Sequence, residues 1–227
     1  MAIRRTAGMP HIARTLGWAA IVLSVIILLV SASVRLAEMA QPPPSPDAFG
    51  DRYVEHPWVA LIHMVPGLLF LTLAPLQFVA RIRRRHIGFH RGLGRILAAC
   101  AAISGLFALL VAILFPAFGG ITTQAATVFF GAIFLFCLAK AIFHIRRKEV
   151  RLHREWMIRT FALALAVASI RVFTALLMMV SDLGFEEVFG VSFWLGFGVN
   201  LLVAEVWINN TRATGRVAST AGSQQRR

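Results

Sequence analysis

The sequence predicts an all-α integral membrane protein, a bundle of six transmembrane helices. Hydrophobic residues make up 58% of the 227 residues and charged residues only 15%, whereas a typical soluble domain has about 25% charged residues. The apolar residues gather in blocks of about 20, the length at which a helix crosses a hydrocarbon layer of roughly 30 Å. The 23 Lys and Arg residues lie mostly between these blocks. The net charge of +13 therefore indicates membrane orientation, and no nucleic-acid partner is predicted.

The first predicted span, residues 16–36, follows a short basic tail at residues 1–15. Its basic start and Ala40 are typical of a cleaved signal peptide, but its apolar run exceeds the roughly 7–15 residues of a signal core. We therefore expect a retained membrane anchor. The other five spans are predicted at residues 58–80, 96–115, 123–143, 157–180 and 188–207.

Two polar segments flank or interrupt these spans. The loop at residues 37–57 contains the motif QPPPSP, and its prolines favour extended backbone over a folded domain. Residues 211–227 are polar and basic, so a disordered tail is expected there. The predicted transmembrane domain accordingly covers residues 16–210.

The distribution of charge places both termini in the cytoplasm. With the amino terminus inside, only Arg35, Arg52 and Arg171 of the 23 Lys and Arg residues lie outside or within a span, as the positive-inside rule requires. Most of the ten acidic residues fall on the outer side. The inner arginines would also contact anionic lipid headgroups at the cytoplasmic face.

Two basic segments of similar sequence connect the inner ends of the spans. Residues 82–95 read IRRRHIGFHRGLGR, and residues 145–159 read IRRKEVRLHREWMIR. Each segment joins an inward-running span to an outward-running one, which predicts a parallel internal repeat of spans two and three as spans four and five. We expect a core of four helices, with the first and last spans packed against it.

Few polar residues lie within the spans, and such residues are candidates for function because they are costly in lipid. Arg171 lies about 20 Å from the inner end, too deep to reach the inner surface, so it binds an anionic partner or caps carbonyls. His63 is either a ligand or proton-relay residue, or is satisfied by carbonyls that Pro66 frees. Asn200 lies at a similar depth, and the three could share a cavity. Glu205 lies deeper inward, where pairing with an inner arginine is favoured over catalysis.

The inner end carries three candidate histidines. His90 and His153 occupy matching positions in the two basic segments, and His144 ends span four nearby. Neutral histidines at matched depth on facing helices are what bis-histidine b-type heme ligation requires. A surface for lipid headgroups or phosphate explains the same His-Arg pairs equally well. Cys100 and Cys137 lie within apolar runs without metal-ligand spacing, so no metal site is predicted.

Several motifs resemble a bacterial family of predicted membrane proteins known as domain of unknown function 2306. The family pattern combines a His-Pro pair, a Pro-Leu-Gln helix, an HR-x-x-GR turn, an HR-x-WMIR turn before an intramembrane arginine, and a final Asn-Leu-x-x-Ala-Glu run. The matching residues are His56-Pro57, Ala74-Pro75-Leu76-Gln77, residues 90–95, residues 153–159, Arg171 and residues 200–205. Ala74 stands where the family often has glycine. The resemblance covers residues 56–208 and implies the fold and a bacterial inner membrane, but no established activity.

Three functional hypotheses follow. The leading one is a redox-associated protein that binds b-type heme or quinone, or assists assembly of a heme enzyme in a membrane redox complex. The second is a transporter of small molecules or anions in which Arg171 is the substrate's countercharge, and the third is an anionic-lipid-binding scaffold. Motifs of ATPases, metalloproteases and serine hydrolases are absent from the sequence, and no reaction is predicted. The candidate cofactor-binding residues are His63, Arg171, Asn200, His90, His153 and His144.

Overall fold

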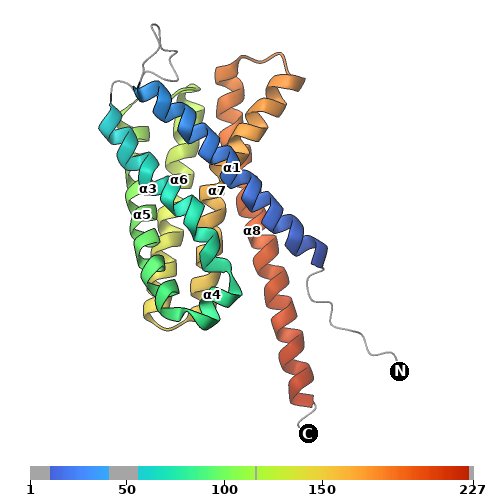
Figure 1. Cartoon of the computed structure of the whole chain (residues 1–227). Coiled ribbons are helices and arrows are strands. Elements are labelled where there is room, and N and C mark those ends of the chain that lie inside the picture. The colour runs from blue at the N-terminus through green and yellow to red at the C-terminus, as the bar shows by residue number, and fades with distance from the viewer. Residues whose placement is uncertain (1–10, 41–55, 116, 225–227) are drawn as a thin grey trace.

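The structure is a computed structural model that describes residues 11–40, 56–115 and 117–224. Within these ranges the chain forms seven helices and no strand, and Figure 1 shows their arrangement. The helices are α1 (His11–Ala40), α3 (Pro57–Phe78), α4 (Ala80–Arg85), α5 (Ile87–Leu114), α6 (Gly120–Arg146), α7 (Val150–Val180) and α8 (Phe185–Gln224).

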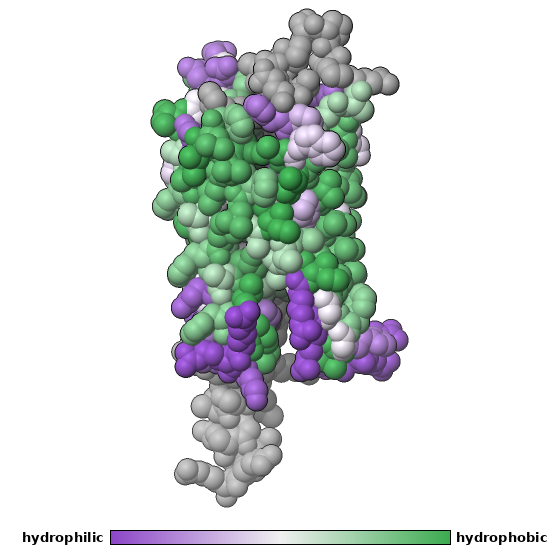
Figure 2. All heavy atoms as spheres, turned by 90° about the vertical axis from the view of Figure 1, so that its left-hand side faces the viewer, coloured by the Kyte–Doolittle hydropathy of each residue, from purple (hydrophilic) through white to green (hydrophobic). Residues whose placement is uncertain are grey.

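Six of these helices are long and apolar enough to cross a membrane, which confirms the predicted all-α fold of six spans. Only α4, with six residues, is too short. Figure 2 shows a broad hydrophobic face, with hydrophilic residues concentrated at the end where α4 lies. Many large apolar side chains on this surface are exposed, as expected of helices that face lipid rather than water.

The helices extend beyond the predicted membrane spans at the two basic segments. The third span was expected to begin at residue 96 and the fifth at residue 157, whereas α5 begins at Ile87 and α7 at Val150. Arginine and histidine are compatible with helical backbone, so each helix continues past the end of its apolar run. His90 and His153 therefore lie in the first turns of helices and not in loops.

Four helices form a closed ring around the main core. Helix α3 contacts α5, α5 contacts α6, α6 contacts α7, and α7 contacts α3, whereas the backbones of α5 and α7 lie diagonally across the ring without a close approach. Phe70, Leu97, Leu138 and Phe161 are buried inside this ring. Helix α1 packs on α3 and α7, and α8 packs on α7 and α6 (Figure 1). The predicted core of four helices, with the first and last spans outside it, is thus observed.

The two basic connections lie at one end of the bundle, which we call the basic end (Figure 1). At the first connection α3 stops at Phe78, Val79 is extended, and α4 follows. At the second, Lys148 has a positive φ of 63° between α6 and α7. Most of the predicted outer loop at residues 37–57 lies outside the described residues. Helix α8 runs past residue 211 to Gln224, and disorder of the tail at residues 211–227 stays a prediction.

Candidate functional site

Three predicted site histidines gather at the basic end. His90 lies in the first turns of α5, His153 in the first turns of α7, and His144 in the last turn of α6. His153 is close enough to interact electrostatically with both His90 and His144. Because α5 and α7 are diagonal in the four-helix ring, His90 and His153 belong to helices on opposite sides of the core.

Two of these histidines have a fixed tautomer. His153 Nδ1 lies 2.9 Å from the carbonyl oxygen of Ala141 on α6, and a carbonyl only accepts, so Nδ1–H is the donor. His144 Nδ1 lies 2.5 Å from Glu149 Oε2, and the carboxylate accepts in the same way. In each neutral ring Nε2 then carries a lone pair, the arrangement that metal-ligating histidines adopt.

His90 differs because its Nδ1 is buried and has no hydrogen-bond partner among the described residues. The same is true of Nε2 of Gln77, near the end of α3. A Cβ atom placed on Gly94 would lie 3.4 Å from Gln77 Oε1, and Gly94 is one helical turn beyond His90. Gln77 therefore packs on α5 about one turn from His90, and we call the region around these two side chains the corner. Buried polar atoms without partners are uncommon, and each is a place where a water molecule or a ligand can bond.

Arg83 of α4 borders this corner and fixes its geometry. Its Nη1 donates to the carbonyl oxygens of Phe78, at 2.8 Å, and Gln77, at 3.3 Å, which satisfies carbonyls at the end of α3. Burial, together with the positive charges of Arg154 and Arg84, lowers the pKa of the Arg83 guanidinium. Arg154 of α7 is thus also a near neighbour, and the corner has a strongly positive rim.

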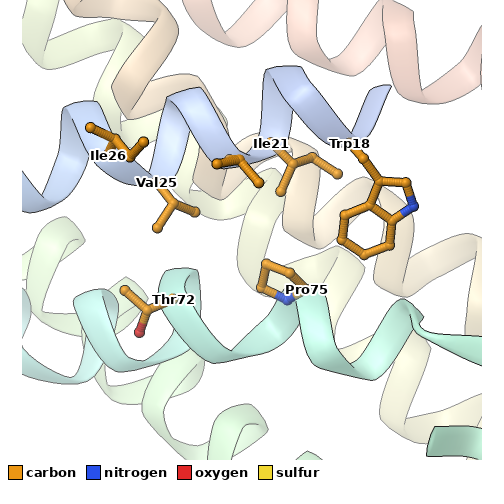
Figure 3. Close-up of a pocket in the computed structure, with 7 residues that line it drawn as sticks. Trp18, Ile21, Val25, Ile26, Thr72 and Pro75 are labelled. Carbon is orange, nitrogen blue, oxygen red and sulfur yellow. The ribbon is translucent and has the colours of Figure 1, made fainter. Parts of the chain in front are cut away.

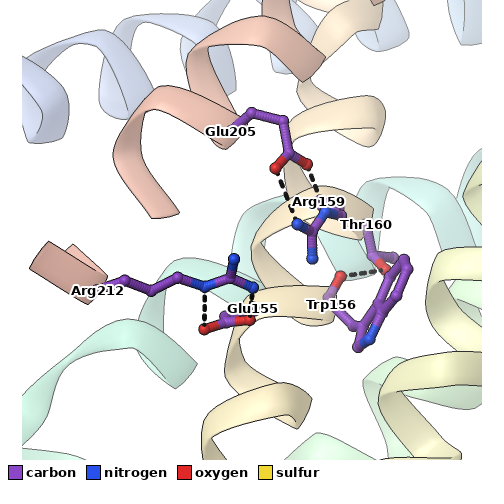
Figure 4. A network of polar contacts seen from close by, with 6 residues as sticks. All are labelled: Glu155, Trp156, Arg159, Thr160, Glu205 and Arg212. Carbon is purple, nitrogen blue, oxygen red and sulfur yellow. Dashed lines mark hydrogen bonds and ion pairs between the residues drawn. The ribbon is translucent and has the colours of Figure 1, made fainter. Parts of the chain in front are cut away.

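Two ion pairs join α7 to α8 at the same end (Figure 4). Arg159 Nε lies 2.5 Å from Glu205 Oε1 and Arg159 Nη2 lies 2.9 Å from Glu205 Oε2, and the guanidinium also lies over the Trp156 ring. Arg212 pairs with both carboxylate oxygens of the buried Glu155. Each of the two helices supplies one arginine and one glutamate to these pairs.

The predicted pairing of Glu205 with an inner arginine is confirmed, whereas the pair of Glu155 and Arg212 was not predicted. Glu155 and Arg159 are four residues apart in the HREWMIR motif, so they share one face of α7. That spacing could have predicted charged contacts between this face of α7 and a neighbouring helix. The position of Arg212, at the predicted start of a disordered tail, concealed its partner.

The three outer candidates lie in separate places. His63 Nδ1–H donates to the carbonyl oxygen of Ser104 on α5 at 2.9 Å. Asn200 of α8 donates to Ser169 Oγ of α7 at 2.6 Å. Arg171 is exposed and donates to the carbonyl oxygen of Val167 within its own helix. Helices α3 and α8 are not in contact, and His63 and Asn200 bond to different neighbouring helices, so the structure does not bring these two side chains together.

A second surface feature is an apolar groove of about 180 Å³ between α1 and α3 (Figure 3). Its one hydroxyl, on Thr72, already bonds to the carbonyl oxygen of Leu68 at 2.8 Å. The groove is therefore mainly apolar, with the indole N–H of Trp18 as its remaining polar group. Its lining residues are Trp18, Ile21, Val22, Val25, Ile26, Thr72 and Pro75.

Comparison with known proteins finds one relationship. The family model described as "Predicted membrane protein (DUF2306)" matches residues 60–208, more than half of the chain. No curated protein and no solved structure matches the chain.

Among the described residues, no group of three or more His, Cys, Asp or Glu side chains is placed to hold a metal ion.

Proposed function

The chain belongs to the family described as "Predicted membrane protein (DUF2306)", a group of unknown function, and we propose that this member binds a redox cofactor at the basic end. The cofactor is a b-type heme or a quinone. One observation carries the proposal: the buried Nδ1 of His90 and Nε2 of Gln77 have no hydrogen-bond partner among the described residues, and His90 is within electrostatic reach of His153.

Heme binding is supported by the two diagonal histidines. Bis-histidine ligation needs two neutral imidazoles that present nitrogen lone pairs from opposite sides. The hydrogen bond from His153 Nδ1–H to Ala141 directs the lone pair to Nε2 and strengthens the ring as a ligand. His90 has no such bond, so either of its nitrogens is available. Arg83 and Arg154 would pair with the two propionates of a heme.

Quinone binding is supported by the unpartnered groups themselves. A quinone carbonyl accepts hydrogen bonds but donates none, and Gln77 Nε2 and a protonated His90 Nδ1 are two donors at one corner. The corner lies at the end of an apolar core that includes Phe78, Leu93 and Phe161. A ring with polar edges and apolar faces suits such a boundary.

The proposal includes an orientation. We infer that the basic end faces the cytoplasm of a bacterial cell and that both termini lie on that side of the inner membrane. The basic segments lie together at this end with the start of α1 (Figure 1), which supports the positive-inside assignment. We further propose that the two basic segments descend from a duplication of one helical hairpin.

Cofactor content of the purified protein tests this function. The full chain is expressed with ample heme supply, purified in mild detergent, and divided into two portions. One portion gives a reduced-minus-oxidised absorption spectrum, in which a Soret and an alpha band identify heme. The other is extracted with organic solvent, and the quinone is quantified against protein after subtraction of the quinone carried by co-purifying lipid.

The proposal expects one of the two cofactors at close to one molecule per chain. A folded preparation that contains neither above the level of a control membrane protein of similar size, purified in parallel, contradicts it. An orientation test uses a cysteine added near the carboxy terminus, which should react with impermeant reagents only after the cells are broken.

A further inference from the structure

Three arginines of α4 are exposed and lack an acidic partner. Arg81, Arg84 and Arg85 line a surface depression of about 440 Å³ together with Ala80. No ion pair or hydrogen bond joins these three guanidinium groups to a described residue. Arg83, the remaining arginine of the helix, points instead to the end of α3. Helix α4 is thus held in place by one arginine while the other three stay available.

The acids of the basic end are already occupied elsewhere. Glu149 pairs with His144, Glu155 pairs with Arg212, and Glu205 pairs with Arg159. No described carboxylate is left near α4 to neutralise its charge. Three guanidinium groups at this spacing create a concentrated positive field that an external anion would relieve.

The second basic segment provides an internal comparison. Arg84 and His86 correspond to Arg147 and Glu149 at an offset of 63 residues. Arg147 Nε lies 3.9 Å from Glu149 Oε1, and its guanidinium lies over the Phe143 ring. The replacement of histidine by glutamate therefore gives the second segment an acid of its own. In the first segment, no acidic residue offsets the positive charge.

The surroundings of α4 place it at the surface of a membrane. It follows the apolar span of α3 directly, and Ile87 and Phe89 just beyond it are exposed. Exposed apolar side chains beside arginines are typical of segments that lie at the boundary between acyl chains and headgroups. The anions present at that depth are lipid phosphates.

From this geometry we infer that the depression formed by Arg81, Arg84 and Arg85 binds the phosphate of an anionic phospholipid headgroup. Guanidinium groups donate two parallel hydrogen bonds to phosphate oxygens, and three of them can surround one phosphodiester. The inference is independent of the proposed redox function, since it uses other residues and another ligand.

Native mass spectrometry of the full chain tests the site. The protein is extracted into detergent, loaded with phosphatidylglycerol, and compared with a phosphatidylcholine-loaded sample. We expect selective retention of phosphatidylglycerol, lowered about fivefold by each arginine removed, in Arg84→Gln, Arg81→Gln/Arg84→Gln and the triple glutamine variant. The matched control replaces Arg146, Arg147 and Lys148 with glutamine, which removes the same charge from the second segment and should leave most of the selectivity.

A further variant, His86→Glu, keeps every arginine and supplies the acid that the second segment has. It should lower retention of phosphatidylglycerol at least threefold, roughly the effect of less than one arginine, while circular dichroism and gel filtration stay unchanged. Equal losses in the α4 triple variant and in its control would overturn the inference, because they indicate unspecific charge. Displacement of the lipid by millimolar inorganic phosphate would also overturn it in favour of a site for free phosphate.

Discussion

Arg159 of α7 and Glu205 of α8 form a two-point ion pair, with Nε–Oε1 and Nη2–Oε2 distances of 2.5 and 2.9 Å. The arginine side chain is 14% exposed and the glutamate 38%, so the arginine depends more heavily on its partner. The pair fixes the register of α8 against the four-helix core at the end that carries the candidate site.

The loss of stability should therefore depend on which of the two partners is removed. Glu205→Gln leaves the largely buried guanidinium without its carboxylate and should lower the free energy of unfolding by about 1–3 kcal/mol, less than for a fully buried pair because Glu205 is partly exposed. Arg159→Gln leaves a carboxylate that solvent or headgroups can reach, and should cost less. Thermal unfolding in one detergent measures both, and the double variant completes the cycle. Equal effects that simply add would show that the two residues do not interact.

The pair of Glu155 and Arg212 should hold the distal part of α8. Glu155 is buried, so Arg212→Gln leaves an unpaired carboxylate at the helix interface. We expect faster amide hydrogen exchange around Ile208 and Thr211, and unchanged exchange in α5, because α5 and α8 make no contact. Unchanged exchange at Ile208 in the variant would contradict this role.

Two neighbouring glycines of α8 give a matched prediction about packing. A Cβ atom on Gly196 would lie 2.5 Å from Ile170 Cγ1 and 3.1 Å from the backbone nitrogen of Ile170, whereas one on Gly198 would meet nothing within 4 Å. Gly196→Ala should push α8 from α7 and destabilise the protein by about 2 kcal/mol or more. Gly198→Ala should be neutral or stabilising by up to about 1 kcal/mol, because alanine favours helix. Melting temperatures of the two variants compare them directly, and similar values would refute the close approach.

The contact between α3 and α5 gives a second packing prediction. A Cβ atom on Gly67 would lie 2.6 Å from Ser104 Oγ, and that hydroxyl lies 3.2 Å from His63 Nδ1. Gly67→Ala should therefore rotate the hydroxyl away from His63 and cost about 1 kcal/mol. The double variant Gly67→Ala/Ser104→Ala removes the clash and should recover most of the lost stability in thermal unfolding. A double variant less stable than Gly67→Ala alone would argue against this geometry.

Depth along a span could be predicted from the sequence, but rotation about a helix axis could not. Glu205 and an inner arginine lie at one depth, and they pair. His63, Arg171 and Asn200 were also placed at similar depths, yet His63 faces α5, Asn200 faces α7 and Arg171 is exposed. The hydropathy of α3 and of α7 changes little with direction around the helix axis. The sequence pattern therefore carried no signal for the direction in which the side chains of these helices point.

The same distinction explains the basic end. The matching positions of His90 and His153 predicted equivalent places near the basic end, and each lies in the first turns of its helix. The helix starts at Ile87 and Val150 were missed, since an apolar run marks contact with hydrocarbon and not the first helical hydrogen bond. In the sequence, Gln77 stands out only as the last residue of the motif Ala74-Pro75-Leu76-Gln77. Its place beside His90 depends on how α3 packs against Gly94.

Variants of the candidate site should separate ligation from folding. His153→Ala and His90→Ala remove side chains from opposite sides of the core, and Gln77→Leu removes one of the unpartnered groups. For a heme site, the histidine variants should each lose about tenfold or more of the bound cofactor, while Gln77→Leu has a smaller effect. For a quinone site, His90→Ala and Gln77→Leu should be the damaging pair. The exposed His86 is the matched control.

The most direct test is the cofactor content of His90→Ala relative to wild type and His86→Ala, all purified in parallel and shown to be monodisperse. The account predicts heme or quinone at close to one per chain in wild type and in His86→Ala, and a loss of about tenfold or more in His90→Ala. Wild-type protein without either cofactor, or a His90→Ala protein that retains the wild-type amount, would contradict the assignment of a redox cofactor to the basic end.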